Sequence, residues 1–319
     1  MYLETRTLPG GEKKHYLTQS YRKGGKTRKI RVFLGSNLSS KELMGNVAAA
    51  EPKLRRRAEA LAGLRDPLHT VLSTDEKKRL ETLAAGIRGK IKVHHLSEGQ
   101  WKRFSELFAY DTNAIEGSTV TESEVEGILE KNAWPRDRPK EEISETYGVA
   151  EAVEFIRKTR EHLSLGLILQ LHGIVFKNSK SFAGKLRAKG VEVAVTDGAG
   201  GIIHRGAPST HVKKLLLELS KWYEENRKKY HPLVLAAIAH NQFENIHPLQ
   251  DGNGRVGRLL LNNILIKHGL PPVNIELARR KEYYASLQAY QKQYDLRPTI
   301  ELLLKEYAAL QKALKKPKK

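Results

Sequence analysis

The chain has 319 residues, enough for one large domain with a buried core and a small additional unit. It contains no cysteine, which excludes disulfides, thiolate nucleophiles and sulfur-ligated metal sites, and we expect a cytoplasmic, reducing environment. The longest apolar run, residues 163–176, is too short to span a bilayer, so we expect a soluble protein that uses no membrane. The formal charge of +20 suits either a nucleic acid or a small polyanion as partner and does not distinguish them.

The N-terminal residues 1–38 alternate short apolar or β-branched runs with the glycine turns PGG and KGGK. This pattern predicts a small unit of three short strands. Residues 1–40 carry nine Lys or Arg against Glu4 and Glu12, so the unit is basic. A solvated surface and a nucleic-acid interface are both open interpretations of that charge.

Residues 39–96 are rich in Ala, Leu, Lys and Glu, with apolar residues at three-to-four spacing, which predicts a helical linker region. Pro52 and Pro67 are expected to break its helices. Ser97 is a candidate N-cap for the next helix, which we expect to stop near Gly117 in a left-handed C′ position. The run TESE, which starts at Thr121, then predicts a capping box.

Helical patterns continue over residues 140–177, 210–246, 255–268 and 279–315. Residues 191–205 differ, because two β-branched runs flank a glycine-rich turn there and predict a projecting hairpin. The fold class is therefore expected to be mainly α, with one hairpin and the N-terminal β unit. Residues 306–319 end in a lysine-rich run and are expected to form a basic C-terminal tail.

The run HPLQDGNGRVGR, residues 247–258, is a loop between two helical segments that leads directly into a helix N-terminus. Unpaired backbone N–H groups at such a terminus bind anions, and Gly252 and Gly254 allow a phosphate to approach the backbone. Arg255 and Arg258 are three residues apart, so both guanidinium groups are expected to reach one polyphosphate. The run therefore predicts a phosphate site.

Two further residues of this run add reactive chemistry. Asp251 supplies the hard oxygen ligand that Mg²⁺ prefers. His247 titrates near neutrality and is suited to take a proton from an incoming hydroxyl. Each residue by itself is more often structural, but together they point to transfer of a phosphoryl-type group.

The same run resembles the signature of the Fic family of AMP transferases, H-x-F-x-D/E-G-N-G-R-x-x-R, and the similarity extends over residues 97–305. The resemblance implies a Fic-type helical bundle over 97–305 that moves AMP from ATP to a Ser, Thr or Tyr hydroxyl of a protein. It implies His247 as the base and Asp251 as the Mg²⁺ ligand, with Mn²⁺ as an alternative ion. The implied nucleotide-binding residues are Gly252, Asn253, Gly254, Arg255, Arg258 and Tyr284.

Several positions refine the resemblance. Leu249 stands where the family has a phenylalanine that packs the loop onto the core. Gly254 replaces the lysine of a kinase-like branch that resembles the Doc toxins, so transfer at the α-phosphate is favoured over the γ-phosphate. The hairpin at 191–205 matches the family's flap, which holds the target segment by main-chain pairing. Tyr283 and Tyr284 fall where family members line the adenosine pocket.

The run TNAIEG, residues 112–117, resembles the family's inhibitory pattern S/T-x-x-x-E-G/N. Thr112 and Glu116 are four residues apart and so share one helix face. The resemblance implies that Glu116 pairs with Arg258 and prevents productive seating of the γ-phosphate, so we expect an autoinhibited enzyme. Some family members remove AMP with this glutamate, and AMP removal or another nucleotidyl transfer is the alternative activity.

Two rival interpretations remain weaker. GNGRVG also fits the dinucleotide fingerprint, with Glu276 about twenty residues further on, but a helical pattern precedes it where a strand is required. A metal phosphohydrolase would need His240, His247 and Asp251 together, and the intervening proline opposes this. Expected partners are ATP and a target protein, including the chain itself, while a nucleic acid at 1–38 and a second copy of the chain stay open.

Overall fold

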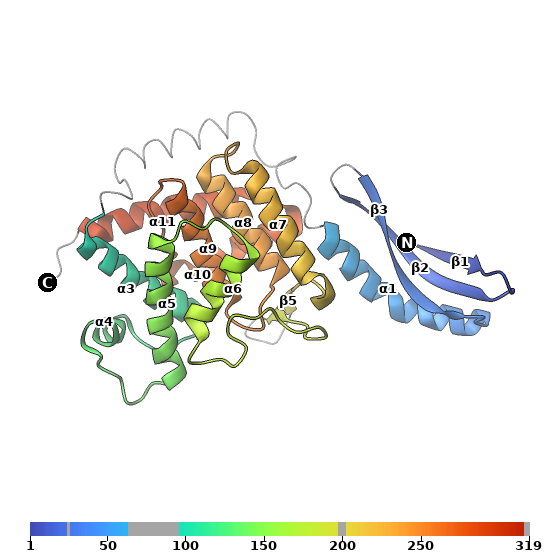
Figure 1. Cartoon of the computed structure of the whole chain (residues 1–319), viewed down its shortest axis with the longest axis horizontal. Helices are drawn as coiled ribbons and strands as arrows, with labels where there is room; N and C mark the ends of the chain where they lie inside the picture. Colours follow the sequence, from blue (N-terminus) through green and yellow to red (C-terminus); the bar gives the residue numbers. More distant parts are fainter. Residues whose placement is uncertain (24–25, 63–95, 197–201, 316–319) are drawn as a thin grey trace.

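The computed structural model describes residues 1–23, 26–62, 96–196 and 202–315. A three-stranded sheet and one helix form an N-terminal unit, and the other helices form a larger bundle (Figure 1). A short hairpin of β4 (Ala194–Thr196) and β5 (Ile202–Arg205) accompanies the bundle. The expected fold class, mainly α with a flap hairpin and an N-terminal β unit, is confirmed.

The N-terminal sheet consists of β1 (Tyr2–Thr7), β2 (Lys13–Lys23) and β3 (Lys26–Ser36), antiparallel and in that spatial order. Because side chains alternate between the faces of a strand, one face collects apolar residues. Helix α1 (Ser40–Ala62) packs across this face. The shared core is formed by Leu17, Leu34, Ala50 and Leu54.

Helix α1 continues through Pro52, so the expected break at this proline is wrong. Proline removes one backbone hydrogen bond, which leaves the carbonyl of Ala48 without its helical partner. Both Ala48 and Pro52 are exposed, so water can satisfy that carbonyl. The expected break at Pro67 and the part of the predicted linker region over residues 63–95 lie outside the described residues.

The first two bundle helices begin at the predicted caps, and the first also ends where predicted. Helix α3 (Glu98–Ile115) starts with a capping box between Ser97 and Gln100, and Gly117 follows its end at φ +100°. Helix α4 (Glu122–Lys131) starts with the capping box of Thr121 and Glu124. Local side-chain chemistry therefore sets the start of both helices.

Helices α8 (Pro232–Ile246) and α9 (Asn253–Lys267) form the centre of the bundle, and almost all of their residues are buried. A helix that is buried on every side belongs to the interior of a domain. These two are surrounded by α5 (Lys140–Lys158), α6 (Leu165–Phe176), α7 (Val212–Asn226), α10 (Arg280–Gln293) and α11 (Arg297–Lys315).

Two predicted helical stretches are each divided in the structure. Residues 140–177 form α5 and α6, and residues 279–315 form α10 and α11, with Tyr294 in a left-handed conformation between the latter pair. Helix α11 buries Tyr307 and Leu310, so the expected tail boundary at residue 306 lies inside this helix. Across the described ranges, no helix combines the length and apolar character needed to cross a membrane.

Candidate active site

The motif loop, residues 247–252, joins α8 to α9 at the centre of the bundle. His247 follows α8 at φ +51°, and Gly252 precedes α9 at φ +78°. A Cβ at position 252 would overlap the ring of Phe176, so both the conformation and the space require glycine. The loop therefore delivers the free N–H groups of the α9 N-terminus to the surface that His247 also faces.

The side chain of Asn253 holds this loop in shape. Its Oδ1 accepts the backbone N–H of Leu249 at 2.9 Å, and its Nδ2 donates to the Leu249 carbonyl at 3.0 Å. The Leu249 side chain is fully buried and thus packs the loop onto the core where the family has phenylalanine. Because the Asn253 side chain is engaged, its backbone N–H is the group left for a phosphate.

The His247 imidazole is oriented and kept neutral by its surroundings. Its Nδ1 lies 3.3 Å from the Glu244 carbonyl oxygen, a contact that places the ring proton on Nδ1 and the lone pair on Nε2. Burial lowers the pKa of His247 to about 4, and the neighbouring His204 acts in the same direction. At neutral pH the imidazole can therefore accept a proton at Nε2.

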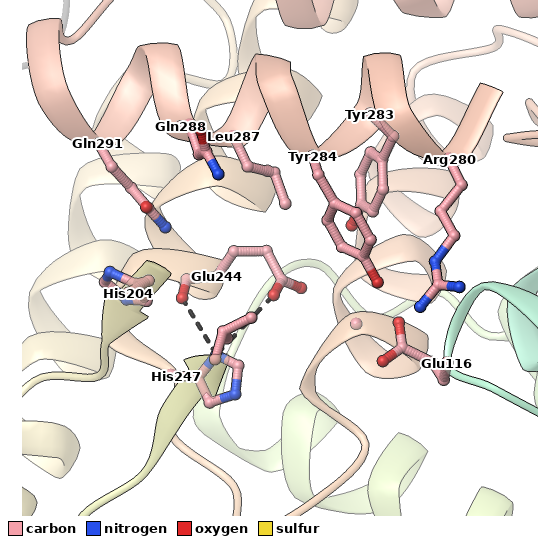
Figure 2. Close-up of a pocket in the computed structure, with 12 residues that line it drawn as sticks. Glu116, His204, Glu244, His247, Arg280, Tyr283, Tyr284, Leu287, Gln288 and Gln291 are labelled. Atoms are coloured by element: carbon pink, nitrogen blue, oxygen red, sulfur yellow. Dashed lines mark hydrogen bonds and ion pairs between the residues drawn. The ribbon is translucent and has the colours of Figure 1, made fainter. Parts of the chain in front are cut away.

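Two adjoining cavities meet at His247. One, of about 380 Å³, lies over the motif loop and β4, and the other, of about 140 Å³, lies below α10. Figure 2 shows the second cavity, with side chains of α10 pointing toward His247 and Glu116. The residues that line both cavities are Glu116, Val195, His247 and Gly254. A bound molecule can therefore extend from one cavity into the other past His247.

The paired tyrosines of α10 have different surroundings. Tyr284 lines the smaller cavity, its hydroxyl donates to the Ile115 carbonyl at 3.3 Å, and the Arg280 guanidinium lies over its ring (Figure 2). Tyr283 is buried, with its hydroxyl 3.0 Å from His240 Nε2. Both tyrosines line the smaller cavity, but Tyr284 is the less buried of the two, while Tyr283 packs mainly into the core.

Arg258 is buried at the base of α9 and holds the end of α3. Its Nε donates to Thr112 Oγ1 at 2.7 Å, and its Nη2 donates to the Thr112 carbonyl at 2.9 Å and to Glu116 Oε1 at 2.8 Å. The Tyr283 hydroxyl accepts from Nη1 at 3.3 Å. The structure therefore brings together the two ends of the expected inhibitory pair, 142 residues apart in sequence.

Position 254 lies directly beneath this ion pair. A Cβ at Gly254 would overlap Glu116 Oε1 and come within 3.0 Å of Arg258 Nη1. Any side chain here would displace the glutamate carboxylate. The Glu116 carboxylate can therefore occupy this space only because residue 254 is glycine.

Arg255 does not join Arg258. Its Nη1 donates to the carboxylate of Glu145, which lies on α5, and its guanidinium lies 4.5 Å from the centre of the Phe176 ring. The two arginines thus have separate partners, and Arg255 Nη2 also lies 3.6 Å from Asp251 Oδ1 of the motif loop. In this arrangement Arg255 ties α9 to α5 and α6 beneath the motif loop.

Asp251 carries the one carboxylate of the motif loop. This carboxylate is half-exposed and lines the larger cavity. Although burial favours its neutral form, the charges of Arg255 and Lys180 and the Gly252 N–H hold its pKa below the ordinary value. An ionised oxygen donor beside a phosphate site fits Mg²⁺, which needs few protein ligands when substrate oxygens complete its shell. Among the described residues no three His, Asp or Glu gather as a metal site.

Comparison with known proteins identifies the family. The model of the Fic/DOC family matches residues 162–265. The chain is 34% identical over 210 residues to protein adenylyltransferase fic-1 of Caenorhabditis briggsae, which covers 64% of this chain and 40% of the relative. It is 31% identical over 255 residues to protein adenylyltransferase Fic of Drosophila melanogaster, covering 77% and 50%. The chain belongs to the Fic/DOC family.

A solved Fic-1 structure from Caenorhabditis elegans has the same fold, with a TM-score of 0.61 and 26% identity over 87% of this chain and 78% of that one. This Fic/DOC chain spans about half the length, or less, of the curated relatives it matches. The predicted family membership is thus confirmed.

The flap of the Fic/DOC domain sits against the motif loop. His204 Nε2 on β5 lies 3.0 Å from the Asn245 carbonyl, and a Cβ at Gly206 would come within 2.9 Å of the His247 Cβ. β4 pairs with β5 along one edge, and no other described strand pairs with it. The larger cavity therefore has a free strand edge along one side.

Sequence reasoning missed Arg187, which connects flap and motif loop in this Fic/DOC domain. Only 5% of this residue is exposed, and its Nε donates to the His247 carbonyl at 2.9 Å. Nη1 donates to the Val191 carbonyl at 2.7 Å, and Nη2 donates to the Ala207 carbonyl. A fourth acceptor, Glu192 Oε2, lies 3.5 Å from Nη1. Because the other three acceptors are backbone atoms, residue types elsewhere in the sequence give little signal of this role.

Glu145 and Glu244 were also missed. Glu145 is the partner of Arg255 and lies 3.7 Å from Lys180, which in turn contacts Asp251 at 3.3 Å. Glu244 lies beneath His247, with Oε2 4.0 Å from Nδ1. Burial raises the pKa of Glu244 to about 8, and the nearby Glu116 carboxylate adds to this.

Proposed function

We propose that this Fic/DOC protein transfers AMP from ATP to a Ser, Thr or Tyr hydroxyl of a protein. The observation that carries the proposal is the neutral His247 imidazole on the wall shared by two cavities, at the free N-terminus of α9. Its relatives of 34% and 31% identity, named protein adenylyltransferases, support the same reaction.

In the proposed reaction the target hydroxyl enters the larger cavity and gives its proton to His247 Nε2. The hydroxyl oxygen then bonds to the α-phosphorus of ATP while the bond from that phosphorus to the bridging oxygen breaks. Pyrophosphate leaves, and the protein side chain carries AMP. A positioned general base of this kind contributes about 10²–10⁴-fold to the rate.

The remaining predicted residues bind the nucleotide. The base and ribose occupy the smaller cavity beside Tyr284, and the α-phosphate contacts the backbone N–H groups at Gly252, Asn253 and Gly254. Arg258 binds the outer phosphates. Arg255, through Glu145, holds the helix that presents them.

Asp251 would hold Mg²⁺, or Mn²⁺, at the phosphates. The ion would neutralise charge on the phosphate oxygens during transfer. The free edge of β4 would hold the target segment by main-chain hydrogen bonds. We place this reaction in the cytoplasm because the chain contains no cysteine.

Glu116 inhibits the reaction in this proposal. Its carboxylate occupies Arg258 at 2.8 Å and repels the triphosphate. Removal of the carboxylate frees Arg258 for the outer phosphates. The Glu116→Gly variant should therefore transfer AMP at least about tenfold faster than the unmodified chain, and His247→Ala should abolish transfer in both backgrounds.

The test uses Mg²⁺ and ATP labelled either at the α- or at the γ-phosphate, with the chain itself and lysate proteins as acceptors. Label from the α-phosphate should appear on protein with Glu116→Gly and be absent with the additional His247→Ala. Glu225→Gly, which removes an exposed glutamate on α7, is the matched control and should change nothing. Label from the γ-phosphate, or none with Glu116→Gly, would contradict AMP transfer. Loss of AMP from a pre-labelled protein would instead indicate the alternative, AMP removal.

A further inference from the structure

The N-terminal sheet has a second face, opposite α1, that no described element covers (Figure 1). Alternation along the strands directs Leu17 and Leu34 toward α1 and their neighbours Tyr16 and Phe33 to the opposite side. We call this side the open face. It is defined by Tyr2, Arg6, Tyr16, Lys29, Arg31 and Phe33.

Aromatic rings are grouped on the open face. Phe33 is 53% exposed and Tyr2 is 42% exposed. Tyr16 and Phe33 are cross-strand partners, with ring centroids 5.4 Å apart. Rings of this size are normally buried, so three of them on one exposed sheet face offer flat surfaces for stacking.

Cations lie beside two of the three rings. The Arg6 guanidinium is 5.6 Å from the centre of the Tyr16 ring, and the Lys29 ammonium is 5.5 Å from the centre of the Tyr2 ring. Glu4 holds Arg6 and Arg31 across the sheet, at 2.9 Å and 2.7 Å. The surrounding residues 1–40 contain nine Lys or Arg against two Glu, so the positive charge is not neutralised.

We propose that the open face binds single-stranded nucleic acid, with bases stacked on Tyr2, Tyr16 and Phe33 and phosphates bound by Arg6, Lys29 and Arg31. Stacking rings beside basic side chains are the two elements that such binding requires. In a duplex the flat faces of the bases are covered by their neighbours, so exposed rings favour unpaired strands. An acidic protein surface would pair with the cations, but its carboxylates would not stack on the three aromatic rings.

The test measures fluorescence anisotropy of labelled oligonucleotides of about 15 nucleotides, as DNA and as RNA, with the full chain. The double variant Tyr2→Ala/Phe33→Ala should weaken binding at least about tenfold. Tyr2→Phe/Phe33→Tyr keeps the rings and should bind within about twofold of the unmodified chain. Trp134→Ala removes a 62% exposed aromatic ring from the bundle and, as the matched control, should leave affinity unchanged.

The charge contribution is tested through salt. Lys29→Gln should reduce the slope of log affinity against log salt by about 0.7, the value for one phosphate of a single strand. Lys158→Gln, an exposed lysine on α5, should leave the slope unchanged. Equal affinity for a duplex, or insensitivity to loss of the two rings, would overturn the proposal and assign any binding to the overall charge. AMP transfer, measured in parallel, is expected to be unaffected, so this proposal and the proposed function can fail separately.

Discussion

At the scale of single residues, Gly254 connects the motif loop to Glu116, the glutamate that we propose to be inhibitory. Because a Cβ at this position overlaps Glu116 Oε1, Gly254→Ala must move that carboxylate away from Arg258. We expect Gly254→Ala to cost about 1–2 kcal/mol of unfolding free energy in the unmodified chain. In the Glu116→Gly background the same change should cost much less, because the overlapping group is gone.

A double-mutant cycle of chemical unfolding measures this coupling without any assay of activity. The four proteins are the unmodified chain, each single variant and the pair. Equal costs of Gly254→Ala in both backgrounds would show that Glu116 does not occupy the space above position 254.

Arg187 is a positioning residue, because it contacts the His247 carbonyl and not the reacting atoms. Lysine cannot donate to three carbonyls in the same fixed geometry. We expect Arg187→Lys, in the Glu116→Gly background, to lower kcat about tenfold or more while KM for ATP changes little, since displacement of a base by about 1 Å is costly.

Arg205→Lys is the control for Arg187→Lys, because Arg205 is an exposed arginine on the same flap. It should leave kcat within about twofold. A purely structural role of Arg187 would instead lower the melting temperature and leave kcat per folded molecule unchanged.

The motif residues could be predicted because they are contiguous, and loop geometry follows from their spacing. The sequence placed His247, Gly252 and the α9 N-terminus together, as the structure has them. It could not assign Arg255 to Glu145, which is 110 residues away and carries no local signal. That both arginines reach one phosphate stays a prediction, because spacing along a helix does not reveal which neighbours already occupy each side chain.

At the scale of elements, Gly148 determines how closely α5 approaches α6. A Cβ on this glycine would overlap the carbonyl of Val175, a backbone atom that cannot move by a side-chain rotation. Gly148→Ala should therefore destabilise the bundle by about 1–3 kcal/mol, although alanine is intrinsically the better helix former. Because α5 also carries Glu145, we expect AMP transfer to decline with the helix displacement.

Gly127→Ala on α4 is the matched comparison for Gly148→Ala. Its new methyl group would meet only the Ala133 Cβ at 3.7 Å, an ordinary contact. Thermal unfolding should show Gly127→Ala equal to or more stable than the unmodified chain, by up to about 1 kcal/mol. Equal effects of the two substitutions would contradict the close packing of α5 and α6.

Helix starts were predictable where local chemistry sets them, as at Ser97 and Thr121, whose side chains cap their own helices. The break expected at Pro52 did not occur, because exposure of the preceding turn decides whether a proline is tolerated. The separation of α10 from α11 was also missed. It depends on the left-handed Tyr294, a conformation that tyrosine seldom adopts. The helix-start signals after it were overlooked: Asp295, whose Oδ1 accepts the Arg297 N–H at 3.1 Å, and Pro298 in the first turn of α11.

For the whole molecule, buried ionisable groups predict how stability depends on pH. Burial raises the pKa of Glu244 to about 8, so the folded state retains a proton that the unfolded state has lost above its ordinary pKa of 4.5. The contribution of this retained proton to the free energy of unfolding is fully present below pH 4.5 and is lost as pH rises through 8. Burial also raises the pKa of Asp111 to about 6 and of Glu306 to about 7, with the same sign.

The buried histidines act in the opposite direction. Burial lowers the pKa of His247 to about 4 and of His240 to about 3, so their contribution is present above 6.5 and is lost as pH falls toward these values. Unfolded histidines are still half protonated at their ordinary pKa of 6.5, so the histidine contribution becomes constant only about one pH unit higher, and above that only the carboxyls change. Ionisation of Glu244 alone should lower the free energy of unfolding by about 2 kcal/mol between pH 6.5 and 8.5.

Chemical unfolding at both pH values measures this dependence. Glu244→Gln, which cannot ionise, should remove most of the loss assigned to Glu244, while Glu225→Gln on the surface should not. An unchanged pH dependence in Glu244→Gln would show that this carboxyl is already ionised in the folded protein.

Arg258 has one further consequence for inhibition. When Glu116 moves, the guanidinium still donates hydrogen bonds to Thr112 and Tyr283 and stays in place. Only its anionic partner can then be exchanged. Glu116 then acts as a tethered ligand, present at a high effective concentration because α3 delivers it. In the proposed function, the nucleotide and the glutamate compete for a single guanidinium. A molecule that binds the end of α3 and draws Glu116 away from Arg258 must therefore tighten ATP binding. By thermodynamic reciprocity, ATP tightens the binding of that molecule by the same factor.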